Sequence, residues 1–260
     1  MCLKSLKNIS QRDTLSKYYS SLHGWIYKQK LANSVFSELH SKTGFKYFCP
    51  SNLIGVKENR IEQDGSYKIT ISSPNEELIK VIKNNLNIGE IINLGEYSFG
   101  LIRFYDYEIR LTNFSVIETT GIIVVTEHLK NSNKTKSLDF LKEDENERYL
   151  QLLKKNIIRK YNTFNGKEVN ENYDLWKNMV IAPIMRGKYS VYCEPLNFNF
   201  IGNKIRFKLG KMTIMQRDIL NFAFDAGFGA YCPYGMGFMV EKKEFNDLNG
   251  LHDFNKLLGK

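Results

Sequence analysis

The residues of this chain best suited to chemistry are its four histidines, because an imidazole with a pKa near 6.5 can accept or donate a proton at neutral pH. His23 and Tyr27 are four residues apart, a spacing that places both side chains on one face of a helix. His128 and His252 lie in stretches that we expect to be polar surface. No group of carboxylates has the spacing of a site for catalytic magnesium, so we expect no metal and no cofactor.

A glycine-rich loop, Asp225–Met239, contains two G-x-G pairs formed by Gly227, Gly229, Gly235 and Gly237. Glycine adopts backbone angles closed to other residues and lets the main chain approach a ligand closely. Exposed main-chain nitrogens in such a loop can bind phosphate oxygens. The loop therefore predicts a main-chain cradle for a phosphate backbone.

The composition agrees with an anionic partner. The chain has 260 residues and a formal net charge of +9, which favours a nucleic acid, although a generally basic proteome gives the same charge. The four cysteines have no zinc-site spacing, which indicates reduced thiols in a cytoplasmic protein. The longest clean apolar run, Ile122–Val125, is too short to span a bilayer, and we expect no membrane association.

The hydrophobic patterns predict one order of elements, which occurs twice along the chain: strand, helix, strand, strand, helix, strand. These elements would position the residues above. In the first round the pattern predicts a helix over 14–31, and Ser73 as the N-cap of a second helix with Pro74 at its first position. The remaining elements of that round are extended segments at 1–8, 45–56, 67–71 and 90–104.

The second round begins with a strand over 107–118 and a polar, exposed loop over 126–147. A helix over 147–161 follows, with Leu153 and Ile157 on its apolar face and Lys160 elsewhere. Thr213 and Gln216 form a capping-box signature for a last helix that ends at Gly227. Strand patterns lie at 178–185, 189–201, 203–209 and 238–240.

This order is typical of an α+β protein with two tandem ferredoxin-like domains, each an antiparallel sheet with both helices on one face. We place the N-terminal domain at 1–106 and the C-terminal domain at 107–260. The two halves share the order of their elements rather than their sequence.

Three regions of the chain carry a resemblance to a known family: Leu22–Tyr27, Glu38–His40 with Gly44–Phe48, and Phe224–Met239. They are similar to the first-helix motif, the histidine with its following basic strand, and the C-terminal glycine-rich signature of the CRISPR-associated endoribonucleases that process repeat RNA. His23 stands where that family often has glutamine, and Ala230–Tyr234 lacks the small polar run expected there.

The resemblance implies metal-independent cleavage of CRISPR repeat RNA, in which a ribose 2′-hydroxyl attacks the adjacent phosphate. The products are a 2′,3′-cyclic phosphate and a 5′-hydroxyl. By position, Tyr27, His40 and Lys46 match the catalytic tyrosine, histidine and lysine, with His23 as a second candidate histidine. Without the resemblance, we interpret His40 as a histidine at the end of a helix, where its positive charge interacts favourably with the C-terminal end of the helix dipole.

Cations and loop aromatics are the candidates for RNA binding. The segment Lys204–Lys208 alternates basic and apolar residues, which predicts a row of cations on one strand face, or simply a solvated face. The expected RNA-binding residues are Lys28, Lys42, Arg186, Lys188, Lys204, Arg206, Lys208, Gly227, Gly229, Tyr231, Tyr234, Gly235 and Gly237.

Two other functions remain open. One is a non-catalytic RNA-binding subunit of a CRISPR effector complex, and the other is a domain pair that binds a small anionic metabolite. The expected partners are CRISPR repeat RNA, effector-complex proteins and a second copy of the chain in a homodimer.

Overall fold

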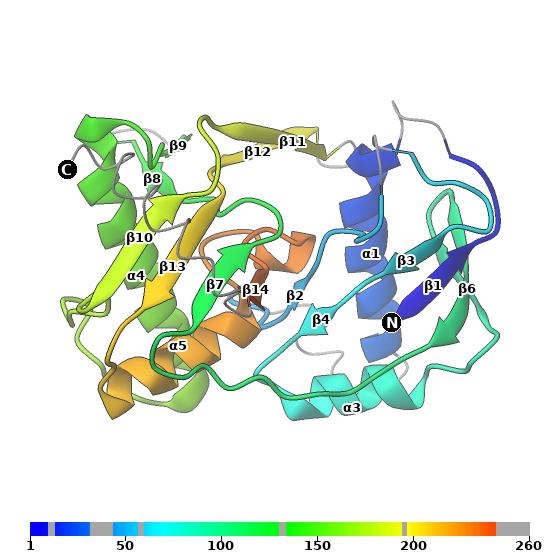
Figure 1. The fold of residues 1–260 in the computed structure, drawn as a ribbon, viewed down its shortest axis with the longest axis horizontal. Coiled ribbons are helices and arrows are strands. Elements are labelled where there is room, and N and C mark those ends of the chain that lie inside the picture. Colours follow the sequence, from blue (N-terminus) through cyan, green and yellow to red (C-terminus); the bar gives the residue numbers. More distant parts are fainter. Residues whose placement is uncertain (10–13, 32–43, 57–59, 130–133, 194–196, 243–260) are drawn as a thin grey trace.

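Two four-stranded antiparallel sheets, each with two helices on one face, form the two lobes of the molecule (Figure 1). The computed structural model describes residues 1–9, 14–31, 44–56, 60–129, 134–193 and 197–242. In each sheet the first strand of the lobe is central. The second sheet has the ferredoxin-like strand order, and in the first sheet the hairpin β5–β6 follows the second helix. The predicted α+β fold is confirmed.

The first sheet has the order β3-β1-β6-β5 and is covered by two helices. Alternate residues of its strands are buried and meet α1 and α3 in one hydrophobic core with Leu3, Phe99, Leu22 and Ile82 among its members. The elements are β1 (Cys2–Ser5), α1 (Thr14–Leu31), β3 (Ser66–Lys68), α3 (Glu76–Asn84), β5 (Ile91–Leu94) and β6 (Tyr97–Arg103). A short pair, β2 (Cys49–Pro50) and β4 (Ile71–Ser72), lies beside them.

The second sheet has the order β10-β13-β7-β14. Ile117, Phe207 and Leu209 point from it into a second core beneath two further helices. The elements are β7 (Val116–Thr119), α4 (Glu143–Asn165), β10 (Met179–Pro183), β13 (Ile205–Leu209), α5 (Ile214–Ala226) and β14 (Met239–Lys242).

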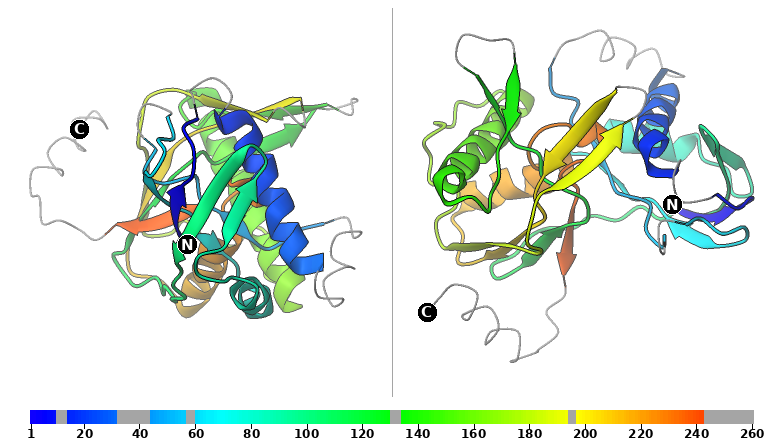
Figure 2. Two further views of the ribbon diagram at one scale, coloured as in Figure 1. Left: turned by 90° about the vertical axis from the view of Figure 1, so that its right-hand side faces the viewer. Right: turned by 90° about the horizontal axis from the view of Figure 1, so that it is seen from above.

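Two hairpins and a short 3-10 turn are added to this second plan. They are β8 (Thr126–His128) with β9 (Thr135–Ser137), β11 (Tyr189–Cys193) with β12 (Phe198–Gly202), and η3 (Cys232–Tyr234) in the glycine-rich loop. The β11–β12 hairpin reaches across to α1 of the other lobe (Figures 1 and 2). Cys193 and Phe200 of the hairpin and Met236 of the loop thereby complete the first core.

Several local predictions are confirmed. The helix over 14–31 is α1, the capping box of Thr213 and Gln216 is present with both hydrogen bonds, and α5 ends at Gly227. β13 alternates as expected, with Ile205, Phe207 and Leu209 buried. None of the helices in the described residues is both long and apolar enough to cross a membrane.

Other local predictions are wrong. The N-cap of α3 is Asn75, whose side chain accepts from the nitrogens of Glu77 and Leu78. Ser73, two residues earlier, instead accepts from the Asn75 nitrogen. The segment 107–115 has no strand, because β7 begins at Val116. The polar stretch 126–147 is not one exposed loop: it contains β8, β9 and the first turn of α4.

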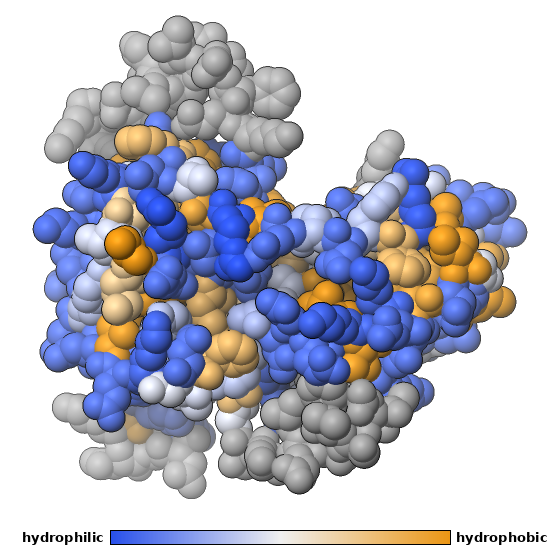
Figure 3. Space-filling model, turned by 90° about the horizontal axis from the view of Figure 1, so that it is seen from below, coloured by the Kyte–Doolittle hydropathy of each residue, from blue (hydrophilic) through white to orange (hydrophobic). Residues whose placement is uncertain are grey.

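The proposed domain boundary at 106/107 lies in the strand-free connection between β6 and β7. Seen from the side of α3 and α5, the surface dips between the two lobes, with apolar side chains among hydrophilic ones along the junction (Figure 3). Since the second lobe supplies side chains to the first core, the boundary separates two sheets rather than two independent cores.

Candidate functional site

His23 and Tyr27 lie one turn apart on α1, as their spacing predicted, with ring centroids 4.6 Å apart. Leu22 and Ile26, on the adjacent side of α1, pack into the first core together with Tyr27, which fixes the rotation of the helix. Tyr27 is buried, and its ring meets Phe48 edge to face at 5.8 Å. His23 is half-buried.

Tyr234 of the glycine-rich loop stacks on His23 with centroids 4.3 Å apart and an interplanar angle of 14°. The stack joins the first helix to a loop more than 200 residues later in the chain. Tyr231, in the same loop, packs on Phe200 of the β11–β12 hairpin at 4.9 Å. One face of each predicted base-stacking tyrosine is therefore covered by protein.

Burial raises the pKa of Tyr27 to about 12, and the nearby Tyr234 phenol adds to the rise. Burial likewise raises the pKa of Tyr234. Both phenols keep their protons at neutral pH. They can donate hydrogen bonds but are poor bases.

Lys46 lies two residues before Phe48, in the segment that leads into β2, and is half-buried. The structure thus brings Tyr27, His23 and the Lys46–Phe48 segment into one neighbourhood through the Phe48 ring. Lys28, the next residue on α1, is exposed. His40 and Lys42 lie outside the described residues.

The glycine-rich loop is buried, which corrects the expectation that its main-chain nitrogens are exposed. Gly227, Gly235 and Gly237 donate their nitrogens to the carbonyls of Ala223, Cys232 and Ile122 at 2.7–2.8 Å. All four glycines have positive φ and buried positions. A β-carbon on Gly237 would lie 1.9 Å from the Phe228 oxygen, and one on Gly229 would lie 2.6 Å from the Val124 oxygen.

These glycines therefore permit a tight internal turn. The nitrogens of Gly227, Gly235 and Gly237 already have internal acceptors, so an amide contact with RNA would have to replace one of these bonds, and that contact stays a prediction. The sequence pattern of two G-x-G pairs is the same for an internal turn and for a phosphate-binding loop.

Lys160 of α4 is the buried cation that sequence reasoning missed. Its ammonium donates to the carbonyls of Gly227 at 3.0 Å and Gly229 at 2.7 Å, and to the Cys232 sulfur at 3.2 Å. It is only 6% exposed. The sequence did indicate this burial. Lys160 is seven residues after Leu153 and three after Ile157, a spacing that places it on the apolar face of α4.

The outer face of β13 presents the predicted cations. Arg206 is exposed and Lys208 half-buried, and Lys204 lies over the Tyr189 ring at 5.2 Å. Glu118 on the neighbouring strand pairs with Arg206 and, at 3.6 Å, with Lys242. The row is thus partly neutralised.

Arg186 and Lys188 are exposed in the turn between β10 and β11, as expected. Lys188 lies 3.8 Å from Asp139. Together with the cations of β13 they give the second lobe a basic side near the β11–β12 hairpin. This side contains all five of the predicted RNA-binding cations of the C-terminal half.

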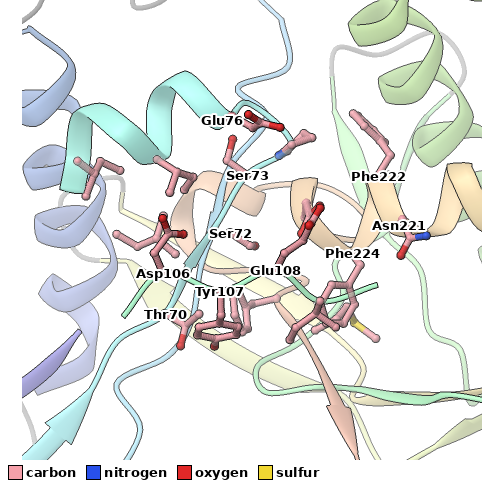
Figure 4. A pocket seen from close by; sticks show the side chains of 18 of the residues that line it. Thr70, Ser72, Ser73, Glu76, Asp106, Tyr107, Glu108, Asn221, Phe222 and Phe224 are labelled. Carbon is pink, nitrogen blue, oxygen red and sulfur yellow. The ribbon is translucent and has the colours of Figure 1, made fainter. Parts of the chain in front are cut away.

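A separate groove of about 890 Å³ lies between α3, the connection 104–110 and α5 (Figure 4). Phe222 and Phe224 of α5 line the groove with aromatic rings, and Asp106 and Glu108 project into it from the connection. Its charged lining contains acidic and basic residues in similar number, and none of the described predicted site residues is part of it. This balance makes it a poor site for a polyanion. The charged residues are Lys68, Lys80, Lys83, Arg110, Lys167, Glu76, Asp106, Glu108, Asp218, Asp225 and Glu241.

Metal ligation has no candidate in the part of the chain that the structure describes: no three His, Cys, Asp or Glu side chains are grouped there as a metal would require. The site at α1 thus offers imidazole, phenol and ammonium groups. Such groups can transfer protons and stabilise negative charge at a phosphate.

Comparison with known proteins places the chain in a family. It is 26% identical over 235 residues to a protein named CRISPR-associated endoribonuclease Cas6 2 from Methanocaldococcus jannaschii, covering 87% of this chain and 92% of the relative. It is 23% identical over 245 residues to the protein named CRISPR-associated endoribonuclease Cas6 1 from the same organism, covering 90% and 86%.

A solved structure described as a RAMP protein binding different RNA substrates has the same fold, with a TM-score of 0.70 and 19% identity over 93% of this chain and 98% of that one. The model of the family "CRISPR associated protein Cas6, C-terminal" matches residues 106–241. Since this match spans more than half of its length, the chain belongs to the Cas6 family.

Proposed function

We propose that the chain is an endoribonuclease that cuts CRISPR repeat RNA by attack of a ribose 2′-hydroxyl on the adjacent phosphate. The observation that carries the proposal is the stack of His23 on Tyr234. It joins the first-helix motif and the glycine-rich signature, two of the segments that resemble the family, at one place. The names of the two relatives from Methanocaldococcus jannaschii support RNA cleavage as the activity.

The reaction needs a base for the 2′-hydroxyl, an acid for the leaving 5′-oxygen and a cation for the phosphoryl oxygens. His40 is proposed as the proton-transfer group, on its resemblance to the family histidine. Lys46 would stabilise the charge on the phosphorane. Tyr27, whose pKa is raised to about 12 by burial, would donate a hydrogen bond to a phosphate oxygen or to the imidazole.

His23 is the second proposed imidazole. Its position between Tyr27 and Tyr234 restricts its rotation, so its ring nitrogens have a defined direction. A positioned acid or base contributes about 10²–10⁴ in rate. Two imidazoles in one site would allow one to act as base and the other as acid.

RNA affinity is proposed to come from side chains rather than from the glycine-rich loop. Arg206, Lys204, Lys208, Arg186 and Lys188 form the basic side of the second lobe. The exposed edges of Tyr231 and Tyr234 would meet bases near the cut. CRISPR effector proteins and a homodimer remain proposed partners, and the cytoplasm the proposed location.

The test is cleavage of labelled repeat RNA in excess EDTA, with the ends of the products mapped. We expect 2′,3′-cyclic phosphate and 5′-hydroxyl ends, and no cleavage of a substrate with a 2′-deoxyribose at the cut. His40→Ala and His23→Ala are compared with His128→Ala, an exposed histidine on β8 that serves as the control.

Loss of cutting with retained binding in His40→Ala supports its role, and wild-type cutting contradicts it. A protein that binds the repeat and never cuts it is a non-catalytic subunit of the same family. A protein that ignores RNA, or whose weak RNA affinity does not change with salt, contradicts the proposal as a whole.

A further inference from the structure

Two cysteines from different lobes meet beneath the glycine-rich loop. Cys49 lies on β2 and is fully buried; Cys232 begins η3 and is 3% exposed. With Phe238 they form a small buried cluster of their own. Both are free thiols.

The two β-carbons both border the space next to Gly227. Each lies 2.9 Å from the point that a β-carbon on Gly227 would occupy, so their separation is at most twice that distance. A disulfide needs β-carbons roughly 3.5–4.5 Å apart, a range that lies within this upper limit. The absence of a side chain at Gly227 is what lets the thiols meet.

Cys232 has the surroundings of a thiolate. The Lys160 ammonium lies 3.2 Å from the Cys232 sulfur. The neighbouring Cys49 side chain and this ammonium hold the pKa of Cys232 below its usual range. Burial raises the pKa of Cys49, and its thiol donates to the Met236 carbonyl at 3.4 Å. The Lys160 ammonium donates to the carbonyls of Gly227 and Gly229 and to the Cys232 sulfur, so this sulfur lies beside a buried positive charge.

We propose that Cys49 and Cys232 form an oxidisable dithiol, a modification site for hydroperoxides that closes into a disulfide between the two lobes. The Cys232 thiolate attacks one oxygen of hydrogen peroxide, the O–O bond breaks, and a sulfenic acid forms with release of water after protonation. The Cys49 sulfur then attacks the Cys232 sulfur, an S–S bond forms, and the second water leaves. Two thiols are oxidised and one peroxide is reduced to two waters.

The link would fasten β2 to the glycine-rich loop on the protein side of the proposed site. Cys49 follows the Lys46–Phe48 segment, and Tyr234 is two residues after Cys232. Oxidation would therefore fix the spacing between the segment with Lys46 and the loop that stacks on His23. The inference concerns the thiols themselves and stands whether or not the protein cuts RNA.

The experiment treats the full-length, folded protein with hydrogen peroxide, blocks the remaining thiols and digests it without reductant. We expect a peptide pair joined through Cys49 and Cys232, lighter by two hydrogens than its parts and separated by dithiothreitol. Cys2→Ser with Cys193→Ser is the control that keeps the link. Cys49→Ser and Cys232→Ser each remove it.

A second measurement examines the thiolate without requiring a disulfide. Iodoacetamide should label Cys232 about tenfold faster than Cys193, which is also buried but lies away from Lys160. In Lys160→Arg, which keeps the charge, the preference should persist, with circular dichroism used to verify folding. Linked peptides that involve Cys2 or Cys193, no link at all, or equal labelling of the two buried thiols would each overturn the proposal.

Discussion

The glycine-rich loop and the outer face of β13 belong to the same lobe and use their polar groups in opposite ways. In the loop, main-chain nitrogens and carbonyls bond to one another and to the buried Lys160. On β13, Arg206 and Lys208 project from the sheet, while the strand's main chain is engaged in the ladder with β7 and β10.

The two regions therefore have different roles: the loop holds side chains in place, and the β13 face supplies cations for binding. A buried loop whose main-chain groups are satisfied can hold Tyr234 against His23, but it has few groups left for a phosphate. Cations on a strand face can bind phosphates but do not fix the position of an imidazole. Substitutions in the loop should therefore change stability and positioning, and substitutions on β13 should change RNA affinity and its salt dependence.

The largest effect is expected from Gly237→Ala. The added β-carbon would lie 1.9 Å from the Phe228 oxygen at a φ of 76°, so both a clash and backbone strain oppose folding. We expect a loss of about 4 kcal/mol in the free energy of unfolding, measured by urea denaturation.

Gly89→Ala is the matched control for that variant. Gly89 also has a positive φ, but no atom lies within 4 Å of the added β-carbon. It should cost only about 1 kcal/mol, the strain alone. Equal losses in the two variants would show that the loop is not tightly packed around Gly237.

Lys160→Met should cost about 3 kcal/mol, because it leaves the carbonyls of Gly227 and Gly229 and the Cys232 sulfur without their buried cation. Lys155→Met on the same helix is the control, since Lys155 is more exposed and makes none of these contacts. A stable Lys160→Met variant with unchanged Tyr234 geometry would contradict the structural role of the ammonium.

Asp225, in the last turn of α5, should make stability depend on pH. Burial raises its pKa from 3.8 to about 7, with Glu108 adding to the rise and Arg110 opposing it. The folded state thus binds this proton more tightly than the unfolded state, so its effect on stability is most favourable below pH 4 and is lost as the pH rises to 7.

Asp225→Asn removes this dependence. The variant should match the wild type at pH 4 and exceed it by about 2 kcal/mol at pH 8, in paired denaturation curves. Parallel pH profiles for the two proteins would mean that the carboxyl is better solvated than its position indicates.

The β13 face should respond in binding rather than in folding. Arg206→Gln should weaken repeat-RNA binding a few-fold and lower the salt slope by about one unit. Glu118→Gln releases Arg206 and Lys242 and should tighten binding by a similar factor. If both substitutions shift affinity in the same direction, the RNA does not pass over this face.

Sequence reasoning predicted the ferredoxin-like order, the face shared by His23 and Tyr27, and the alternation of β13, because each follows from a periodicity of 3.6 or 2 residues. It misjudged the loop, since positive φ serves internal turns and ligand cradles equally. It also missed that Lys160 is buried, although its spacing from Leu153 and Ile157 places it on the apolar face of α4. The partners of Lys160 could not be predicted, because they are carbonyls and a sulfur from a distant segment.

The contribution of Phe200 and Met236 to the core around α1 has a consequence for how the molecule is made. During synthesis, the first lobe leaves the ribosome well before the segments that cover one side of its helix. Until the last quarter of the chain has been synthesised, that side of α1 is exposed to solvent. The nascent protein therefore remains a substrate for chaperones and proteases. The fragment 1–106 should consequently be insoluble alone and recovered by co-expression with 107–260.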